Sequence, residues 1–424
     1  MRILMGAQSC GFGPVAKLAA ISRLIPQHER VFCGDTVAVV YARRNAAMFD
    51  RLHDTGAERA GLLDELIEQS DCVVSVMDAE LVCRAYAAGR PVVMVDSLFS
   101  FWQHEVELDR LAELCRDMPR GRAEAVLERL APLRPHEQIL AAHLLCDHSI
   151  VQNLRGVPER MARFRELGAG PMHLTGSIID TQVLDGISPQ AEADCDLLIN
   201  IGGFKNFLLD YDVNNAYLKL FDRWIPDLLK DWERFDRLTV CGGAFSEGRE
   251  HQVEVRGRHA SFRMLPHNEL LQQVGTVPHY MLTPGLTSIH EAISIGRLPM
   301  ALPEQHYGHV FNLRSLDGTL FHSCGVRLTD VAPEHPVPQD DFTGTAAIVA
   351  LAERILEEEE LYKRFRHMLN SRIEQLVGFD ERQRADGVAE LRARLAANPI
   401  SQITESLFGT PAGAQGAIAT GGRR

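Results

Sequence analysis

Thr287, Ser288 and Glu291 stand at helical spacing just after a Thr-Pro-Gly turn, at residues 283–285. The apolar periodicity of residues 286–295 predicts a helix, which places both hydroxyls in its first turn. First-turn N–H groups have no partner within their helix, and the helix dipole favours negative charge beside them. The pattern predicts an anion site, with Glu291 one turn further in and within reach of a ribose hydroxyl pair. The alternative is an ordinary strand–turn–helix that begins with hydroxyl residues and leaves its Glu exposed.

The elements that must position these residues are two short apolar runs. Residues 280–282 predict a buried strand before the turn, and Gly296 is expected to end the helix. Residues 298–302 predict the next strand. Gln305 and His306 follow that strand as further polar candidates, and a helix is expected to restart near Asn312.

Length and composition limit the class of protein. A chain of 424 residues predicts two domains, and 46% hydrophobic with 24% charged residues is an ordinary globular balance. The formal net charge of −13 argues against a general nucleic-acid binder. We expect no membrane span, no signal peptide and a cytoplasmic location, because no long uncharged run occurs and the chain opens directly on a strand. Nine scattered cysteines without a C-x-x-C pair predict buried thiols and no zinc site.

Strands and helices alternate along the first half of the chain. We expect strands at residues 37–41, 71–77, 91–95, 148–152 and 172–175, with helices at 15–24, 79–88 and 158–167. This alternation predicts an α/β fold with a parallel sheet covered on both faces. Ligands of such sheets lie beyond the carboxyl ends of the strands, so polar residues just after a strand are candidates.

Two segments of the first half satisfy this condition. The loop after the first strand contains Cys10, Gly11, Phe12 and Gly13, where glycine lets a ligand approach the backbone. Asp96 directly follows the strand at 91–95, and two aromatic residues that could hold a flat acceptor come next, Phe99 and Trp102. Asp96 is a candidate general base, with a helix N-cap as its alternative. For the two aromatic side chains, the alternative is a place in the core.

The second half begins with an apolar strand at residues 195–201, followed by Gly202, Gly203 and Lys205. A further strand at 238–241 ends at Gly243, and His267 follows a proline before another helix. Lys205 could meet a phosphate or a sugar carboxylate, or lie solvated on a turn. His267 could contact a base and ribose, or simply begin its helix. Asp210 and Asp212 could hold a divalent ion on a loop, but a helical context would separate them, and no metal is expected.

Residues 263–316 resemble the nucleotide-sugar-binding half of GT-B glycosyltransferases. The resemblance rests on the segments RMLPHNELL at 263–271, TPGLTS at 283–288 and HEA at 290–292, followed by Gly296, Pro303 and Asn312. It implies two Rossmann-like domains whose parallel sheets face a central cleft. By this resemblance the first segment holds the base, the second the diphosphate, Glu291 the ribose, and the loop at Gln305 and His306 the donor sugar.

The resemblance also assigns parts of the chain. Residues 1–175 would bind the acceptor, 176–194 would be a linker, and 195–379 would bind a UDP-sugar as co-substrate without further cofactor. Residues 380–408 would form a helix that crosses back to the first domain, and 409–424 a disordered tail. Gly203, Lys205, Gly243, His267, Gly285, Thr287 and Ser288 would line the donor site. Asp96, His104 and Glu105, in that order, are the candidate bases of an inverting transfer.

Two segments are similar to cytosylglucuronate synthases of nucleoside-antibiotic pathways: the opening segment, SCGFGPVAKLAAISRL at 9–24, and DSLFSFW at 96–102. This similarity implies UDP-glucuronate as donor and free cytosine as acceptor. Three alternatives stay open: a non-hydrolysing sugar-nucleotide epimerase, a transferase with a lipid-linked acceptor, and a non-catalytic nucleotide-sugar-binding protein. The partners expected are small molecules, and a homodimer is compatible with the sequence.

Overall fold

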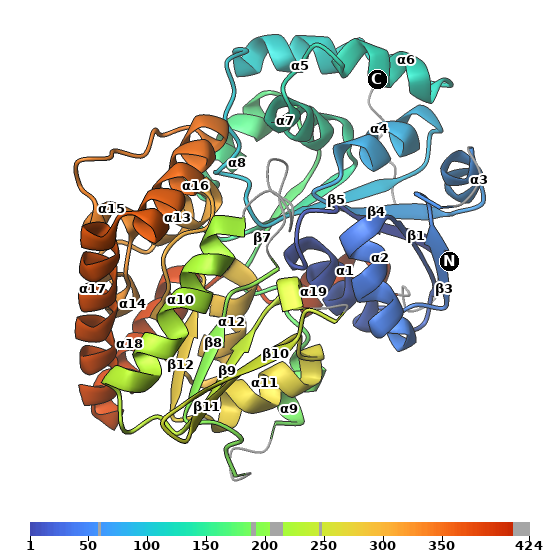
Figure 1. The fold of residues 1–424 in the computed structure, drawn as a ribbon. Coiled ribbons are helices and arrows are strands. Elements are labelled where there is room, and N and C mark those ends of the chain that lie inside the picture. The colour runs from blue at the N-terminus through green and yellow to red at the C-terminus, as the bar shows by residue number, and fades with distance from the viewer. Residues whose placement is uncertain (58–60, 188–191, 204–214, 246–247, 410–424) are drawn as a thin grey trace. The chain divides into compact units, whose positions relative to one another are not determined.

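The computed structural model describes residues 1–57, 61–187, 192–203, 215–245 and 248–409. These residues form two compact units, Met1–Asp180 together with the described residues from Leu395 onward, and the residues between Thr181 and Arg394. The first division point falls inside the segment 176–194 that the sequence predicts as a linker. Each unit contains its own sheet, and each is described separately below (Figure 1).

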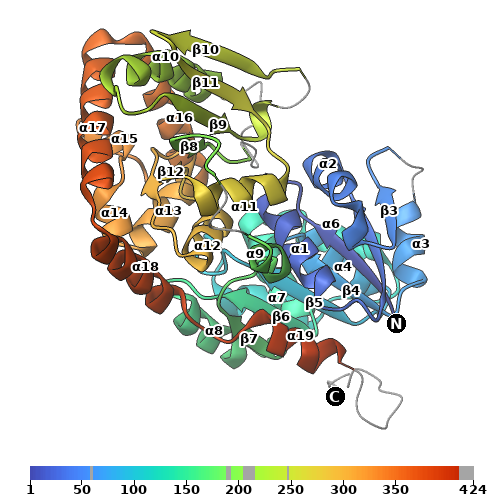
Figure 2. The same ribbon diagram turned by 90° about the horizontal axis from the view of Figure 1, so that it is seen from below.

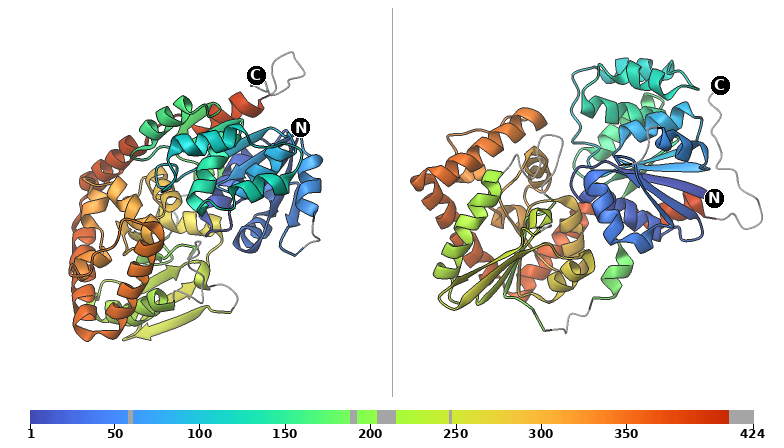
Figure 3. Two further views of the ribbon diagram at one scale, coloured as in Figure 1. Left: turned by 90° about the horizontal axis from the view of Figure 1, so that it is seen from above. Right: turned by 45° about the vertical axis from the view of Figure 1, so that its right-hand side comes forward.

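The first unit is built on a seven-stranded sheet in the order β3-β2-β1-β4-β5-β6-β7, with every neighbouring pair parallel. Its inner strands β4 and β5 are buried throughout, as is typical of a parallel sheet covered on both faces, and helices lie on both sides of the sheet (Figure 3). The strands are β1 (Arg2–Ala7), β2 (Glu29–Gly34), β3 (Arg51–Asp54), β4 (Cys72–Val76), β5 (Val92–Asp96), β6 (His148–Gln152) and β7 (Met172–Thr175).

Nine helices of four or more residues belong to the described part of this unit. They are α1 (Gly13–Arg23), α2 (Thr36–Arg44), α3 (Leu62–Glu68), α4 (Ala79–Ala87), α5 (Leu108–Arg116), α6 (Ala123–Leu130), α7 (Pro135–Leu145), α8 (Val157–Glu166) and α19 (Ile400–Phe408). The last of these follows the return of the chain to the first unit at Leu395 and packs against β7.

The second unit has a six-stranded sheet in the order β10-β11-β9-β8-β12-β13. All neighbouring pairs are parallel except β10 and β11, which form an antiparallel edge. The strands are β8 (Leu197–Asn200), β9 (Arg237–Cys241), β10 (His251–Val255), β11 (Arg258–Arg263), β12 (His279–Leu282) and β13 (Met300–Ala301).

Helices cover both faces of this sheet, with α10, α16 and α17 on one side and α11 and α12 on the other (Figure 2). The helices are α9 (Thr181–Asp185), α10 (Asn215–Asp231), α11 (His267–Thr276), α12 (Leu286–Ile295), α13 (Tyr307–Ser315), α14 (Leu320–Cys324), α15 (Leu328–Val331), α16 (Asp341–Glu357), α17 (Glu359–Gly378) and α18 (Glu381–Leu395). The prediction of two Rossmann-like α/β domains with parallel sheets is confirmed.

In both sheets the first strand lies inside the sheet, and the chain builds outward on one side before it crosses to the other. The strand order therefore reverses between β1 and β4 in the first unit and between β8 and β12 in the second. Open α/β sheets bind their ligands beyond the carboxyl ends of the strands at such a reversal. The topology thus places a candidate ligand site at one edge of each sheet.

Several sequence-based element predictions need correction. Residues 37–41 were expected as a strand, but they belong to helix α2. Short apolar runs do not distinguish strand from helix, and the buried residues of α2, which include Val37, Ala38, Tyr41 and Ala42, follow helical spacing.

Three further corrections concern the second half of the chain. The strand expected at 298–302 contains only two paired residues, and α13 begins at Tyr307 rather than near Asn312. Residues 380–408 form two helices, α18 and α19, and not one. Of the tail expected at 409–424, only Gly409 lies within the described residues.

Two general expectations concern thiols and membranes. All nine cysteines lie in the described residues, where they form no disulfide, and eight of them are buried. Among the described helices, none combines the length and the apolar character needed to cross a membrane.

Candidate functional site

Three turns meet at the carboxyl edge of the second sheet, one after each of β8, β9 and β12. The Asn200 side chain accepts a hydrogen bond from Gly202 N at 2.9 Å and donates to the Tyr280 hydroxyl at 3.1 Å. Gly243 N donates to Gly202 O at 3.0 Å, and Thr283 N donates to Asn200 O at 2.9 Å. These bonds fix the three turns against one another at the point where the strand order reverses.

Glycine makes this close approach of the three turns feasible. Gly202 has a φ of 75°, and a Cβ there would lie 2.8 Å from Thr283 Oγ1. A Cβ on Gly242 would lie 2.9 Å from Gly202 O. The predicted donor residues Gly203 and Gly243 directly follow these two positions, so both lie at this edge of the sheet.

Helix α12 begins at this edge and spans the residues predicted for it, with Gly285 as its N-cap. The N-cap glycine has no side chain that could cap the helix, and no acidic residue occupies its first turn. Thr287 and Ser288 lie half-buried in that turn. The first-turn amides and the helix dipole thus provide the anion-binding features expected from the sequence.

Glu291 lies one turn further along α12 and is paired with His267. Glu291 Oε1 lies 2.7 Å from His267 Nε2, although 24 residues separate the two in the chain. Glu291 is only 5% exposed, unlike the exposed glutamate of the alternative interpretation. Because Ser288 and Glu291 are three residues apart on a helix, they share one face of α12.

The loop after β13 is tied into the same edge. Gln305 is buried, and its Nε2 donates to Ile201 O at 2.6 Å, which connects the loop to the turn after β8. His306, the N-cap of α13, is half-buried, and burial lowers its pKa to about 4. The imidazole of His306 is therefore neutral at pH 7.

The sequence analysis overlooked Glu304, which directly precedes this loop. Its side chain is buried and accepts a hydrogen bond from Leu328 N at 2.9 Å. Burial raises the pKa of Glu304 to about 7. A charged residue just after an apolar strand is the signal that could have identified it.

Some predicted residues fall outside the described part of the chain. Lys205 is one of them, and so are Asp210 and Asp212. Among the residues that the structure describes, no group of three or more His, Cys, Asp or Glu side chains could hold a metal ion.

Asp96 lies at the carboxyl end of β5 in the first unit and is fully buried, with 0% exposure. Its Oδ2 accepts from Trp102 Nε1 at 2.5 Å and lies 2.9 Å from His143 Nε2, while Oδ1 accepts from Leu98 N at 2.6 Å. Asp96 is not a helix N-cap, because α5 begins only at Leu108. A role as base stays a prediction and would require this buried carboxylate to become accessible.

Phe99 and Trp102, predicted to bind an acceptor, are also buried in the first unit. The Phe99 ring packs edge-on against His143 at 4.6 Å and Phe164 at 5.0 Å between centroids. This packing favours the core alternative, and acceptor contact by either side chain stays a prediction. His104, the second candidate base, is half-buried, with Nδ1 3.0 Å from Val106 O.

The loop after β1, predicted to border an acceptor, lies at the reversal point of the first sheet, and its contact with an acceptor stays a prediction. Gln8 N donates to Val76 O at 3.0 Å, which joins the loop to the end of β4. Cys10, Phe12 and Gly13 are half-buried, Gly11 has a φ of 64°, and Phe12 is the N-cap of α1. The loop thus keeps partly accessible atoms at this edge.

Asp78, which the sequence analysis did not select, stands at the same reversal point, two residues after β4. The residue is half-buried, and its Oδ1 caps α4 by accepting from Leu81 N at 3.1 Å. Burial raises the pKa of Asp78 to about 6. Met77 before it has a φ of 59°, a conformation that non-glycine residues rarely adopt and that occurs often at functional sites.

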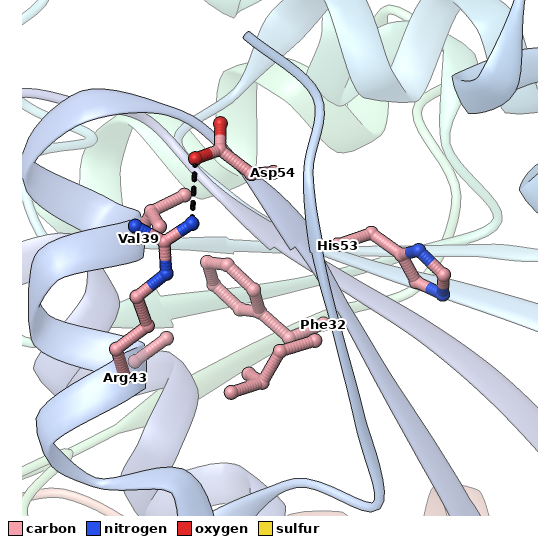
Figure 4. A pocket seen from close by; sticks show the side chains of 7 residues that line it. Phe32, Val39, Arg43, His53 and Asp54 are labelled. Carbon is pink, nitrogen blue, oxygen red and sulfur yellow. Dashed lines mark hydrogen bonds and ion pairs between the residues drawn. The ribbon is translucent and has the colours of Figure 1, made fainter. Parts of the chain in front are cut away.

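A small pocket elsewhere in the first unit contains none of the predicted site residues. It is lined by Phe32, Val39, Ala42, Arg43, Leu52, His53 and Asp54. Figure 4 shows the ion pair of Arg43 Nη2 with Asp54 Oδ2, at 2.9 Å, and His53 pointing away from it. The pocket therefore adds no support to the sites above.

Comparison with known proteins finds a distant likeness in fold. No family model and no curated protein sequence matches the chain. Among solved structures, UGT89C1 of Arabidopsis thaliana complexed with UDP-L-rhamnose has a TM-score of 0.45 and 11% identity, covering 93% of this chain and 99% of that one. The spinosyn forosaminyltransferase SpnP has a TM-score of 0.44 and 14% identity, covering 89% and 100%.

A third structure is UGT73P12 of Glycyrrhiza uralensis complexed with glycyrrhetinic acid 3-O-monoglucuronide. Its TM-score is 0.43 and its identity 11%, covering 93% of this chain and 96% of that one. All three TM-scores lie below 0.5, so the likeness is remote and concerns the fold alone.

Proposed function

We propose that the chain is a glycosyltransferase that moves a sugar from a UDP-sugar to a small-molecule acceptor. The observation that carries the proposal is the edge of the second sheet, where α12 begins with a glycine N-cap and Glu291, one turn further along, is buried and paired with His267. An anion site next to a buried carboxylate suits a nucleotide, whose diphosphate is negative and whose ribose offers two hydroxyl donors.

In this proposal the second unit binds the donor. The first-turn amides of α12, with Thr287 and Ser288, would stabilise the charge that develops on the leaving diphosphate. Glu291 would accept from the ribose, and His267 would hold its carboxylate in place. Gln305 and His306 would contact the donor sugar, and Lys205 would meet the diphosphate or a sugar carboxylate. The UDP-sugar is a co-substrate, and the proposal requires no other cofactor.

The first unit would supply the acceptor site and the base of an inverting transfer. Asp78 is the first candidate, because it stands half-buried at the reversal point and burial raises the pKa of its carboxyl group to about 6. Asp96 and His104 are the other candidates. The acceptor would be bordered by the loop residues Cys10, Gly11, Phe12 and Gly13. Phe99 and Trp102 would lie further from the loop surface, on the inner side of the acceptor site.

A finer form of the proposal takes UDP-glucuronate as donor and cytosine as acceptor. It rests on the sequence similarity at the opening segment and at residues 96–102. A mass-spectrometric screen would offer the purified protein UDP-glucuronate, UDP-glucose and UDP-N-acetylglucosamine, each with and without cytosine. A cytosine–glucuronate product is the expected result. UDP release without a cytosine conjugate would reject cytosine, and an isomerised donor sugar without acceptor would indicate the epimerase alternative.

Replacing Glu291 by alanine is expected to weaken UDP binding about 10- to 100-fold, since a hydrogen bond to a charged group contributes roughly 1.5–3 kcal/mol. The wild type should bind UDP more tightly than 2′-deoxy-UDP, and the variant should bind both equally. Isothermal titration calorimetry would measure the four affinities.

Ser288→Ala serves as the matched variant on the same face of α12. It should weaken UDP binding while keeping the preference for the ribose nucleotide. If both variants remain folded and bind UDP as tightly as the wild type, the assignment of this edge as a nucleotide site is wrong.

A further inference from the structure

His309 lies on the first turn of α13, and its ring is buried with only 7% exposure. Its Nδ1 lies 3.3 Å from the backbone nitrogen of Gln305. A backbone N–H can only donate, so Nδ1 must be the acceptor nitrogen of this pair. In a neutral imidazole the proton then resides on Nε2, which becomes a hydrogen-bond donor.

Two features keep the ring neutral and in place. Burial lowers the pKa of His309 well below its ordinary value, and the neighbouring His306 acts in the same direction. The two rings pack with their centroids 3.9 Å apart. The tautomer and the orientation of His309 are therefore both determined before any ligand binds.

Nε2 of His309 lies beside the N-terminus of α12. A Cβ built on Gly285, the N-cap residue, would lie 4.0 Å from this nitrogen and 3.9 Å from Thr283 O. Among the described residues no hydrogen bond to this Nε2 is recorded. The donor nitrogen of this buried ring thus lies close to the N-cap position of α12, beside the space that a Gly285 side chain would fill.

We propose that Nε2–H of His309 donates a hydrogen bond to a phosphate oxygen of the nucleotide held at the N-terminus of α12. The inference rests on the proposed nucleotide site and adds a residue to it that stands outside the segment 283–291. The helix amides and the imidazole would hold the phosphate from two elements, α12 and α13. The absence of a side chain at Gly285 leaves room for the oxygen between them.

The chain offers a matched set of variants for this inference. In His309→Gln the side-chain oxygen can replace Nδ1 as acceptor and the amide can still donate, whereas His309→Met has similar length and no donor. Gly285→Ala adds one methyl group that would face Nε2 at 4.0 Å. Because Gly285 has φ −80° and ψ 131°, alanine is compatible with its backbone.

The experiment compares the affinities of each variant for UDP and for uridine, which lacks the phosphates. His309→Met and Gly285→Ala should weaken UDP binding by roughly ten-fold or more and leave uridine binding unchanged. His309→Gln should remain within a few-fold of the wild type for both. Thermal unfolding would identify any variant that fails to fold, and the two substitutions at different positions keep the test independent of either one.

Each outcome decides one question. Unchanged UDP affinity in His309→Met would overturn the inference while the wild-type affinity still supports the nucleotide site. An equal loss for UDP and uridine would also overturn it, since it would indicate a general distortion. A wild-type protein that binds neither compound would refute the proposed function itself.

Discussion

Replacing Asp78 by asparagine is expected to lower kcat/KM by roughly 100- to 10,000-fold, the usual contribution of a general base. The substitution removes the proton acceptor but keeps an oxygen that can accept from Leu81 N and cap α4. UDP affinity should not change, because the donor residues belong to the second unit. Steady-state kinetics on the acceptor found by the substrate screen would measure the loss, and calorimetry would measure the UDP affinity.

The pH profile adds an independent signature. Because the pKa of Asp78 is raised to about 6, its carboxylate form, which accepts the proton, becomes dominant above that pH. Wild-type kcat/KM should therefore rise with pH through about 6, and kcat/KM of Asp78→Asn should not show this rise. For folding the direction is opposite: the raised pKa stabilises the protonated native state, so this contribution is present below about pH 4 and lost as pH rises through 6.

Asp96→Asn and His104→Gln are the comparison variants, because both residues are candidate bases from the sequence. Retained activity in Asp78→Asn together with a large loss in either comparison variant would transfer the role of base to that residue. Asp96→Asn must be checked for folding first, since Asp96 makes three buried interactions.

The second large effect concerns stability rather than turnover. Asp96→Ala is expected to lower the free energy of unfolding of the first unit by about 3–5 kcal/mol, because it removes the acceptor of buried donors. The groups left without it are the indole N–H of Trp102, the N–H of Leu98 and the imidazole of His143. Thermal and denaturant unfolding followed by near-UV circular dichroism would measure the change.

Ser97→Ala is the matched control for this effect. Ser97 is the next residue and is also buried, but its hydroxyl makes only a weak contact with Met77 Sδ at 3.5 Å. Ser97→Ala should lower the free energy of unfolding by less than about 1 kcal/mol, which is within the range of a single modest hydrogen bond. An equally small effect in Asp96→Ala would show that the buried cluster contributes little to the first unit.

The sequence was sufficient for local features. The bounds of α12, the end of that helix at Gly296 and the polar groups of the turns after β8, β9 and β12 all follow from short-range periodicity and glycine placement. These features depend on residues close in the chain, where helix starts and strand ends have recognisable signals.

Contacts between segments that are far apart in the chain could not be predicted from the sequence. The contacts of Glu291 with His267, of Gln305 with Ile201, and of His309 with the α12 turn join elements whose registers a single sequence does not specify. Asp96 shows the related difficulty of burial. A carboxylate after a strand looks the same in sequence whether it caps the next helix, as Asp78 does, or bonds three interior groups, as Asp96 does.

The return of the chain at Leu395 has a consequence for biosynthesis. The first unit is completed by residues from late in the chain, which bond to the residues that follow β6 and β7: Gly176 N donates to Asn398 O at 3.0 Å, and Asn153 Nδ2 donates to Ala396 O at 2.7 Å. Chains are synthesised from the N-terminus, and domains generally fold as units. During synthesis on the ribosome, the first unit therefore lacks these contacts at its β7 edge until the whole of the second unit has been translated. The part of the protein that begins first is thus the part that can be completed last.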